Sequence, residues 1–231
     1  MTRATTVKLA ASNAVKEACL ELVPAFERAS GHAVAAAYGG TIDTTERIDG
    51  GEVVDVVILS AASIDGLIGR GRLVAGSRVD FVRSAIGVAT RQGAPAPDIS
   101  SGEAVAASLL KSNTVVLSSG PSSVYLAGLF DRMGIAAALA PKIRKLAPGH
   151  SVGAALARGD GDIGFTQVSE LIAIAGIAYA GPLPADIQNV TVFSLGLHAS
   201  APSPAAARAM MAFLASPSAA PAIRHAGLDP A

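Results

Sequence analysis

The chain has 231 residues, 51% of them hydrophobic, and 18 basic residues balance 18 acidic ones, so its formal net charge is zero. A chain of this length can bury a sizeable core, but a neutral one has no general field to hold nucleic acid or an anionic membrane. No uncharged apolar run reaches about 18 residues, which excludes insertion into a membrane.

The N-terminal residues MTRATTVKLAAS do not resemble a secretory signal, because threonines and a strand-like segment follow the one arginine. As it stands, the sequence therefore predicts a cytoplasmic protein, and a periplasmic one if a leader peptide has been removed. Cys19 is the single cysteine, so no internal disulfide is possible. Its position beside Leu22 and Val23 on the apolar side of a predicted helix indicates a buried thiol.

Short β-rich runs alternate with helical patterns along most of the chain. The first series predicts strands at 6–12, 32–40 and 53–60 and helices near 14–30, 42–50 and 63–70. The second series predicts strands at 114–119, 141–148 and 162–167 and helices near 122–133, 151–158 and 168–174. This alternation is typical of parallel strands with crossover helices, so we expect an α/β fold of two units.

Two further strands connect these series. One covers 80–90 and runs into a Gly/Pro loop, and the other follows the loop at 179–189; helices at 203–216 and 218–228 come last. The simplest path enters the second unit once and returns once. We therefore expect a discontinuous first lobe, residues 1–86 and 190–231, and a second lobe of residues 87–189.

Small and hydroxyl-bearing residues follow the predicted strands, where ligands of open parallel sheets bind. The candidate ligand-binding residues of this kind are Ser12, Asn13, Gly40, Thr41, Ser60, Ala61, Ser122, Ser123 and Gln167. Each alone is explained by ordinary helix capping. Together, hydroxyls and free N–H groups at helix N-termini form an anion site that needs no cationic side chain, with Tyr125 as a further donor.

Arg83 is the one charged candidate for ligand binding. It lies in the strand over 80–90, and a guanidinium matches a carboxylate through two parallel hydrogen bonds. The alternative is a structural ion pair with an acidic residue such as Asp80 or Asp55. An Arg83 that faces the ligand would favour a carboxylate, and an externally paired Arg83 would favour a tetrahedral oxyanion.

Other patterns predict no chemistry of their own. The four histidines are far apart without metal-ligand spacing, so we expect no metal and no cofactor. The glycines at 66–76 fit a helix C-cap with Arg70 and Arg72 rather than a dinucleotide loop, and RGDGDIGF fits a turn before a strand. No hydrolase motif is present.

Five segments resemble successive landmarks of the molybdate-binding type of periplasmic substrate-binding protein: residues 9–41, 55–90, 120–135, 155–171 and 213–228. The resemblance implies a two-lobed type II clamshell in which each lobe is a mixed sheet flanked by helices, with two crossover segments. It implies that the ligand closes between the lobes through hinges near 83–88 and 187–192. The matched oxyanion contacts are Ser12, Thr41, Ala61, Ser123 and Tyr125.

Two features depart from molybdate transporters. GGT replaces the usual serines of the second loop, and Asn13 follows Ser12 at the first site. In addition, residues 167–188 look more like the branch that includes aconitate isomerase, whose ligand is a small carboxylate. The sequence thus predicts a small-anion-binding module, which would deliver its ligand to an ABC transporter permease if exported. The alternative is a cofactor-free isomerase of an unsaturated polycarboxylate, with Tyr125, Glu170, Asp43 or His150 as candidate bases.

Overall fold

The computed structural model describes residues 5–231 of the chain. They form two compact units, of which unit 1 holds the chain up to Arg83 and again from Val192 to Ala231, and unit 2 holds Ser84–Thr191. The chain passes from one unit to the other in strand β4 (Val79–Arg91) and returns in β9 (Val190–Leu197). The two crossings therefore interrupt unit 1 in sequence, and unit 2 is continuous.

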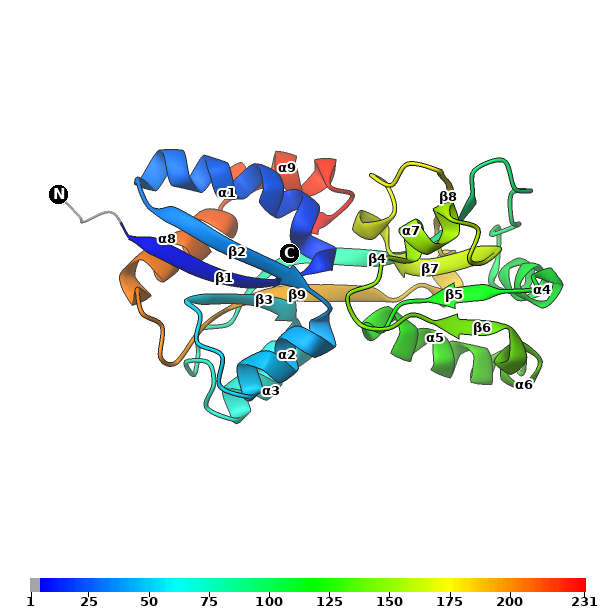
Figure 1. Cartoon of the computed structure of the whole chain (residues 1–231), viewed down its shortest axis with the longest axis horizontal. Helices are drawn as coiled ribbons and strands as arrows, with labels where there is room; N and C mark the ends of the chain where they lie inside the picture. Colours follow the sequence, from blue (N-terminus) through cyan, green and yellow to red (C-terminus); the bar gives the residue numbers. More distant parts are fainter. Residues whose placement is uncertain (1–4) are drawn as a thin grey trace. The chain divides into compact units, whose positions relative to one another are not determined.

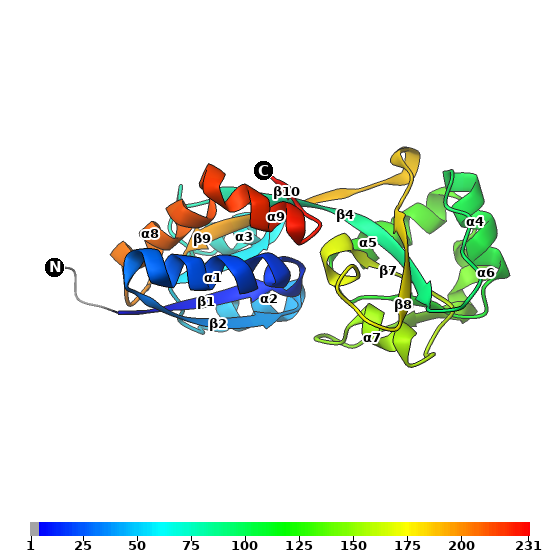
Figure 2. The ribbon, with the colours of Figure 1, turned by 90° about the horizontal axis from the view of Figure 1, so that it is seen from above.

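Unit 1 is a mixed sheet with helices on both faces (Figures 1 and 2). Its strand order is β2-β1-β3-β9-β4. The strands β1 (Thr6–Ser12), β2 (Ala33–Gly39) and β3 (Val56–Ser60) are parallel to one another, and β9 is antiparallel to β3. The short strand β10 (Asp229–Pro230) pairs with β4 in antiparallel orientation. Helices α1 (Lys16–Ser30), α8 (Pro204–Leu214) and α9 (Ala220–His225) cover one face, and α2 (Thr41–Asp49) and α3 (Ala61–Gly69) the other.

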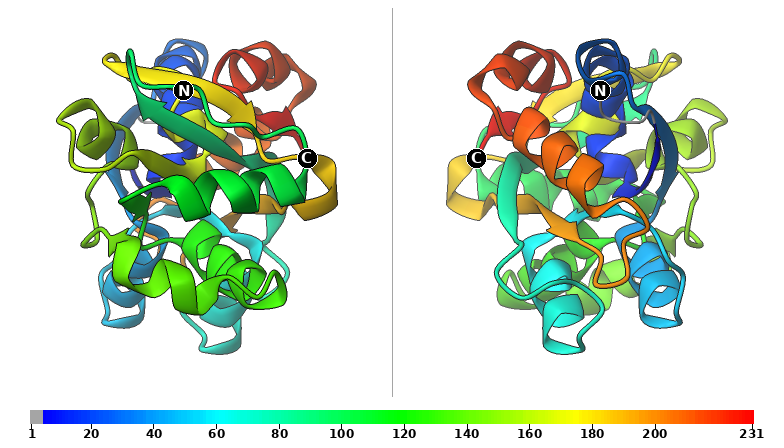
Figure 3. Two further views of the ribbon diagram at one scale, coloured as in Figure 1. Left: turned by 90° about the vertical axis from the view of Figure 1, so that its right-hand side faces the viewer. Right: turned by 90° about the vertical axis from the view of Figure 1, so that its left-hand side faces the viewer.

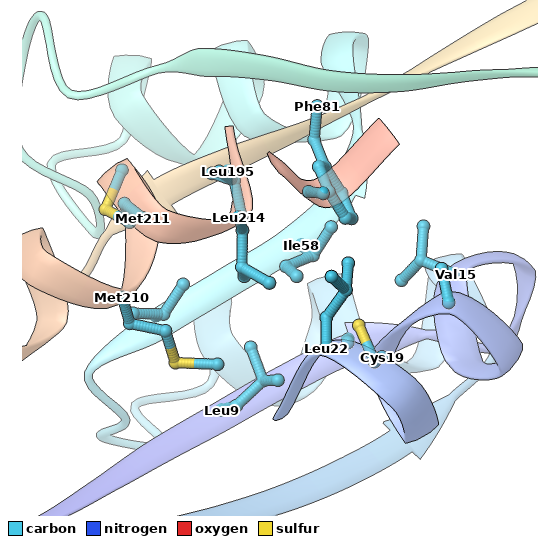
Figure 4. Close-up of a cluster of buried hydrophobic side chains, with 14 of the residues drawn as sticks. Leu9, Val15, Cys19, Leu22, Ile58, Phe81, Leu195, Met210, Met211 and Leu214 are labelled. Atoms are coloured by element: carbon cyan, nitrogen blue, oxygen red, sulfur yellow. The ribbon is translucent and has the colours of Figure 1, made fainter. Parts of the chain in front are cut away.

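The core of unit 1 forms between the sheet and the helices α1, α8 and α9 (Figure 4). The Cys19 side chain lies in this core with Leu22 of the same helix and Leu9 of β1, and none of the thiol is exposed. Burial raises the pKa of the Cys19 thiol to about 12, against a smaller lowering by its hydrogen bond with Tyr38. The predicted buried thiol is confirmed.

Unit 2 repeats the architecture with another strand order. The strands run β4-β7-β5-β6, in which β5 (Val115–Leu117), β6 (Ile143–Lys145) and β7 (Ile163–Gln167) are parallel and β4 is antiparallel to β7; β8 (Ile177–Pro182) also pairs with β4. Helices α4 (Gly102–Lys111), α5 (Pro121–Arg132) and α6 (Ala136–Leu139) pack into one core, and α7 (Val152–Ala157) into another (Figure 3). No helix within residues 5–231 is long and apolar enough to span a membrane.

Most predicted elements are confirmed, including the Arg70 C-cap, but the helix over 168–174 is wrong. Only a 3-10 turn, η3 (Val168–Glu170), forms there. Leu171 is fully buried, and the chain must return within a few residues to pair as β8, which leaves no length for a helix. Strand β8 and helix α4 were not predicted. Strand β8 ends in Gly-Pro, which favours a loop, and α4 directly follows a Gly/Pro-rich segment, although its buried residues Val105 and Leu109 have helical spacing.

We expect alanine at Gly164 to destabilise unit 2. A Cβ there would lie 2.6 Å from Val152 Cγ1 and 2.9 Å from Leu156 Cδ1, so strand β7 and helix α7 would have to separate. Overpacking of this kind costs about 1–2 kcal/mol, measurable by urea unfolding. Gly128→Ala is the matched control, since its Cβ would meet only a flexible arginine end 3.5 Å away and alanine favours a helix. Equal unfolding midpoints for the two variants would contradict the prediction.

Candidate functional site

In unit 1, three parallel strands end together and deliver Ser12, Thr41 and Ser60 to one edge of the sheet. The register pairs Ser12 of β1 with Gly39 of β2, and Ala11 with Ile58 of β3. The hydroxyls of Ser12 and Thr41 lie 3.0 Å apart and share a buried hydrogen bond. The predicted convergence of these two residues is therefore a consequence of strand register.

Helix α2 starts at this edge without a side-chain cap. Gly40 is its N-cap residue and has an extended conformation, so Thr41 opens the helix with no side chain accepting from the first N–H groups. Such N–H groups have no partner inside the helix and carry its positive dipole end. Helix α3 differs, because the Ser60 hydroxyl accepts from Ser63 N and donates to Ser63 Oγ at 3.0 Å.

The remaining unit 1 candidates flank these hydroxyls. Asn13 is half-buried at the start of a 3-10 turn. Ser12 caps this turn, because its Oγ accepts a hydrogen bond from Ala14 N at 3.3 Å. Ala61 is the first residue of α3 and is also half-buried. The predictions missed Thr44, one helical turn after Thr41, whose buried hydroxyl has no hydrogen-bond partner among the described residues and packs beside Gly39.

In unit 2, a second hydroxyl cluster follows strand β5. The hydroxyls of Ser118 and Ser122 lie 3.1 Å apart, and Gly120 N donates to Ser118 Oγ at 3.2 Å. Ser122 and Ser123 are buried in the first turn of α5, which again begins without a side-chain cap and has proline at its first position. The two units thus share one local design, an uncapped helix N-terminus beside hydroxyl groups at the end of a parallel strand.

Tyr125 and Gln167 already have protein partners. The Tyr125 hydroxyl donates to Ile187 O at 3.0 Å. The amide nitrogen of Gln167 faces β4 and donates a hydrogen bond to Ser84 Oγ at 2.8 Å. The amide oxygen then lies 3.3 Å from the Thr191 hydroxyl. A ligand would have to compete with these bonds, so both side chains first serve to join elements of unit 2.

Arg83 is exposed in β4, where it pairs in register with Asp229 of β10. No carboxylate within the described part of the chain forms an ion pair with its guanidinium. Asp80 instead accepts from Ser194 at 2.7 Å and pairs with Arg78 at 2.9 Å; these bonds, with a smaller contribution from the charge of Arg83, lower the pKa of Asp80. Between Arg83 and Asp80 the structure therefore shows an effect of charge but no ion pair in contact.

Glu170 lies just beyond the end of strand β7, in the turn η3. Its side chain is half-buried, and desolvation raises the pKa of its carboxyl to about 7, against a smaller lowering by a hydrogen bond from the Thr166 side chain. A carboxyl with this pKa exchanges protons near neutral pH, as a general acid or base must. The residues at 5–231 hold no group of three His, Cys, Asp or Glu side chains suited to a metal ion.

Comparisons with known proteins agree with this architecture. A family model described as bacterial extracellular solute-binding protein matches residues 7–229. An aconitate isomerase from a Pseudomonas species is 38% identical to this chain over 232 residues, covering 98% of this chain and 88% of that protein.

Solved structures of low sequence identity share the fold. A periplasmic molybdate-binding protein of Azotobacter vinelandii superposes with a TM-score of 0.82 at 20% identity, covering 96% of this chain and 98% of that one. A sulfate-binding protein of Mycobacterium tuberculosis gives a TM-score of 0.78 at 20% identity, covering 98% and 87%. The two-unit α/β fold is therefore that of periplasmic binding proteins, as predicted.

Proposed function

Because the chain belongs to the bacterial extracellular solute-binding protein family, we propose that it binds a small carboxylate anion through the hydroxyls and helix N-termini at its strand ends. The observation that carries the proposal is the repeated local design: α2 and α5 both begin without a side-chain cap, beside the hydroxyls of Ser12 and Thr41 and of Ser118 and Ser122. Backbone N–H groups donate hydrogen bonds and hydroxyls can donate them, so an acceptor-rich anion suits this arrangement.

Arg83 favours a carboxylate over a tetrahedral oxyanion. Neutral donors suffice for a compact, desolvated oxyanion, whereas a polycarboxylate spreads its charge and recruits a cation. Arg83 is exposed and its guanidinium is not held by a carboxylate of the described chain, so it is available for that role. The 38% identity to an aconitate isomerase supports the same ligand class.

A second candidate function, isomerisation of an unsaturated tricarboxylate, follows from that same relative. The region of similarity covers 98% of this chain, so it spans the strand ends of both units. A binding protein that also moved a proton on its ligand would need one titratable group near the donors. For the binding function alone, we expect a location outside the cytoplasm, since the family is described as extracellular and one structural relative as periplasmic. We also expect an ABC transporter permease as partner, since another structural relative is described as the substrate-binding domain of a molybdenum ABC transporter.

The proposed ligand class can be tested by thermal unfolding, since a ligand that binds only the folded state raises the midpoint. We expect cis- or trans-aconitate to raise it, and molybdate, tungstate, sulfate and phosphate to have smaller effects. Arg83→Ala should weaken aconitate binding about 10-fold, because the variant loses one charge-assisted hydrogen bond to the ligand. Arg28→Ala, which removes an exposed cation from the last turn of α1, is the control.

Each alternative has its own signature in that experiment. Stabilisation by molybdate or tungstate alone, unchanged by Arg83→Ala, would overturn the carboxylate proposal in favour of an oxyanion receptor. Stabilisation by none of these anions would contradict anion binding altogether.

A further inference from the structure

We propose that unit 2 holds a second ligand site, separate from the proposed anion site, that binds a small carboxylate with an apolar body. The site is a cavity of about 550 Å³, a size typical of small-molecule pockets. It lies between the end of strand β4, the loop over 92–98 that follows this strand, and the C-terminal end of helix α4. The proposed function assigns no role to this Gly/Pro-rich loop.

The cavity lies at the opposite end of the sheet from the candidate ligand site. Ile163, the first residue of β7, lines the cavity, whereas Gln167, the last residue of β7, belongs to the candidate ligand site. At about 3.3 Å per residue, these two residues are about 13 Å apart. Antiparallel pairing brings the end of β4 to the start of β7, because Thr90 pairs with Ile163 and Ile86 with Gln167. The cavity is therefore a separate site rather than an extension of the first one.

Hydrogen bonds hold the loop in place beside the cavity. At the start of the loop, Ala94 N donates to Arg91 O at 3.1 Å. At its end, Asp98 N donates to Ser108 Oγ, and Ser108 Oγ donates to Asp98 O, both at 3.1 Å. These two bonds fix the loop to helix α4, and the two prolines of the loop restrict the backbone between them and Ala94. The wall that the loop forms is thus present before a ligand binds.

The loop and the sheet give the cavity an apolar side. The apolar lining residues come from the loop and from β7: Ala94, Pro95, Ala96, Pro97 and Ile163. The two prolines offer carbon surface without a backbone N–H group. Such a surface favours a hydrocarbon or aromatic group, because the transfer of apolar area out of water lowers the free energy.

Two cations that line the cavity form no ion pair within the part of the chain that the structure describes. Arg91 is the last residue of β4 and Lys111 the last residue of α4, and both are exposed. The charge of Asp98 attracts Lys111 without an ion pair in contact. A carboxylate matches a guanidinium through two parallel hydrogen bonds, and a nearby ammonium adds to the attraction.

The two aspartates that line the cavity are already bound by backbone N–H groups. Asp162 Oδ2 accepts from Asn113 N at 2.7 Å and from Thr114 N at 3.3 Å. Asp98 Oδ1 accepts from Ser100 N at 3.0 Å. Each carboxylate thus uses one oxygen to fix the backbone, whereas the two cations have no ion pair. This difference favours an anionic over a cationic group on the ligand.

Thr90 contributes an unsatisfied hydroxyl. It lines the cavity, and its buried hydroxyl has no hydrogen-bond partner among residues 5–231. Ile86 and Val88 of the same strand pack in one core with Val105 and Leu109 of α4, so strand alternation places Thr90 on the α4 side of the sheet. A buried hydroxyl without a partner is unfavourable, and a ligand oxygen that accepted its proton would remove this cost.

The test titrates the full chain with benzoate, which joins one carboxylate to an apolar ring, and follows the backbone amides by NMR. We expect saturable shifts centred on residues 92–98 and 108–113. Benzamide, which lacks the charge, and acetate, which lacks the ring, should each bind at least about 10-fold more weakly.

Arg91→Ala should weaken benzoate binding about 10-fold, because the variant loses a charge-assisted hydrogen bond. Lys145→Ala, which removes an exposed cation from β6 of the same unit, is the matched control and should bind benzoate as the wild type does. Arg83→Ala should also leave benzoate binding unchanged, since Arg83 belongs to unit 1 and to the other site.

Two results would overturn the inference. Shifts centred on residues 118–123, with an affinity that falls in Arg83→Ala and not in Arg91→Ala, would assign benzoate to the proposed anion site. The absence of saturable binding up to about 10 mM benzoate would show that the cavity is no site for this class of ligand.

Thr90→Val tests the hydroxyl without a change of charge. Because this hydroxyl has no partner, a methyl group of similar size in its place should leave the urea midpoint unchanged or raise it. Benzoate should nevertheless bind about 3- to 10-fold more weakly, since the ligand loses a donor. A variant that binds benzoate as tightly as the wild type would remove Thr90 from the site and overturn that part of the inference.

Discussion

Asp55→Ala is expected to lower the free energy of unfolding by about 3–5 kcal/mol, because it leaves buried donors without an acceptor. The Asp55 carboxylate is fully buried just before β3. Its two oxygens accept from Lys8 N at 2.8 Å and from Ser203 N at 2.6 Å. One side chain therefore ties strand β1 to the start of helix α8, 148 residues further along the chain.

The helix α8 depends on this contact, since its N-cap residue Ser203 provides no side-chain cap of its own. The carboxylate also lies at the positive end of the helix dipole. Urea unfolding should give a lower midpoint for Asp55→Ala and an intermediate one for Asp55→Asn, whose amide oxygen still accepts one bond. Asp131→Ala, at an exposed position of α5, is the matched control; an equal loss for both aspartates would refute the assignment.

Stability is expected to fall as the pH rises from about 4.5 to above 7, through the titration of Glu170. The folded state holds this carboxyl at a pKa of about 7, against 4.5 for the free side chain. Between these values the folded chain binds the proton more tightly than the unfolded chain, so unfolding becomes easier as the pH rises. The contribution is present in full below about pH 4.5 and is lost once the pH passes 7.

The size of this effect follows from the shift. A rise of about 2.5 in pKa corresponds to about 3 kcal/mol, and partial exposure of the side chain reduces it to about 2 kcal/mol. Glu170→Gln should therefore be about 2 kcal/mol more stable than the wild type at pH 8 and equal to it near pH 4. Urea unfolding at both pH values checks this, with Glu103→Gln as reference; a constant difference between the two variants would count against it.

The local elements of unit 1 were predictable because each one is encoded by neighbours in sequence. The strand over 6–12 is confirmed as β1 without change, and the helices near 14–30 and 42–50 as α1 and α2. The alternation of these elements also predicts parallel strands with aligned ends, and this brings Ser12 to Thr41. Local patterning and chain connectivity were sufficient for this part of the site.

The partners of individual side chains could not be predicted in the same way. Gln167 is the last residue of strand β7, where a ligand donor would be expected, yet its amide contacts Ser84 and Thr191 of the crossover strands. Tyr125 lies one turn into α5, but its hydroxyl is engaged by Ile187, 62 residues away. Such contacts depend on how distant strands and loops pack, and no spacing in the sequence encodes them.

The sequence by itself determined the fold class, the position of small and hydroxyl-bearing residues at the strand ends, and the absence of a general charge to attract polyanions. These properties depend on periodicity and composition, which are local. Only the tertiary structure decided which helix N-termini lack a cap, that Arg83 forms no ion pair within the described residues, and that Glu170 is desolvated beside Thr166. Hydrogen bonding and ionisation depend on burial, and burial is created when distant segments pack together.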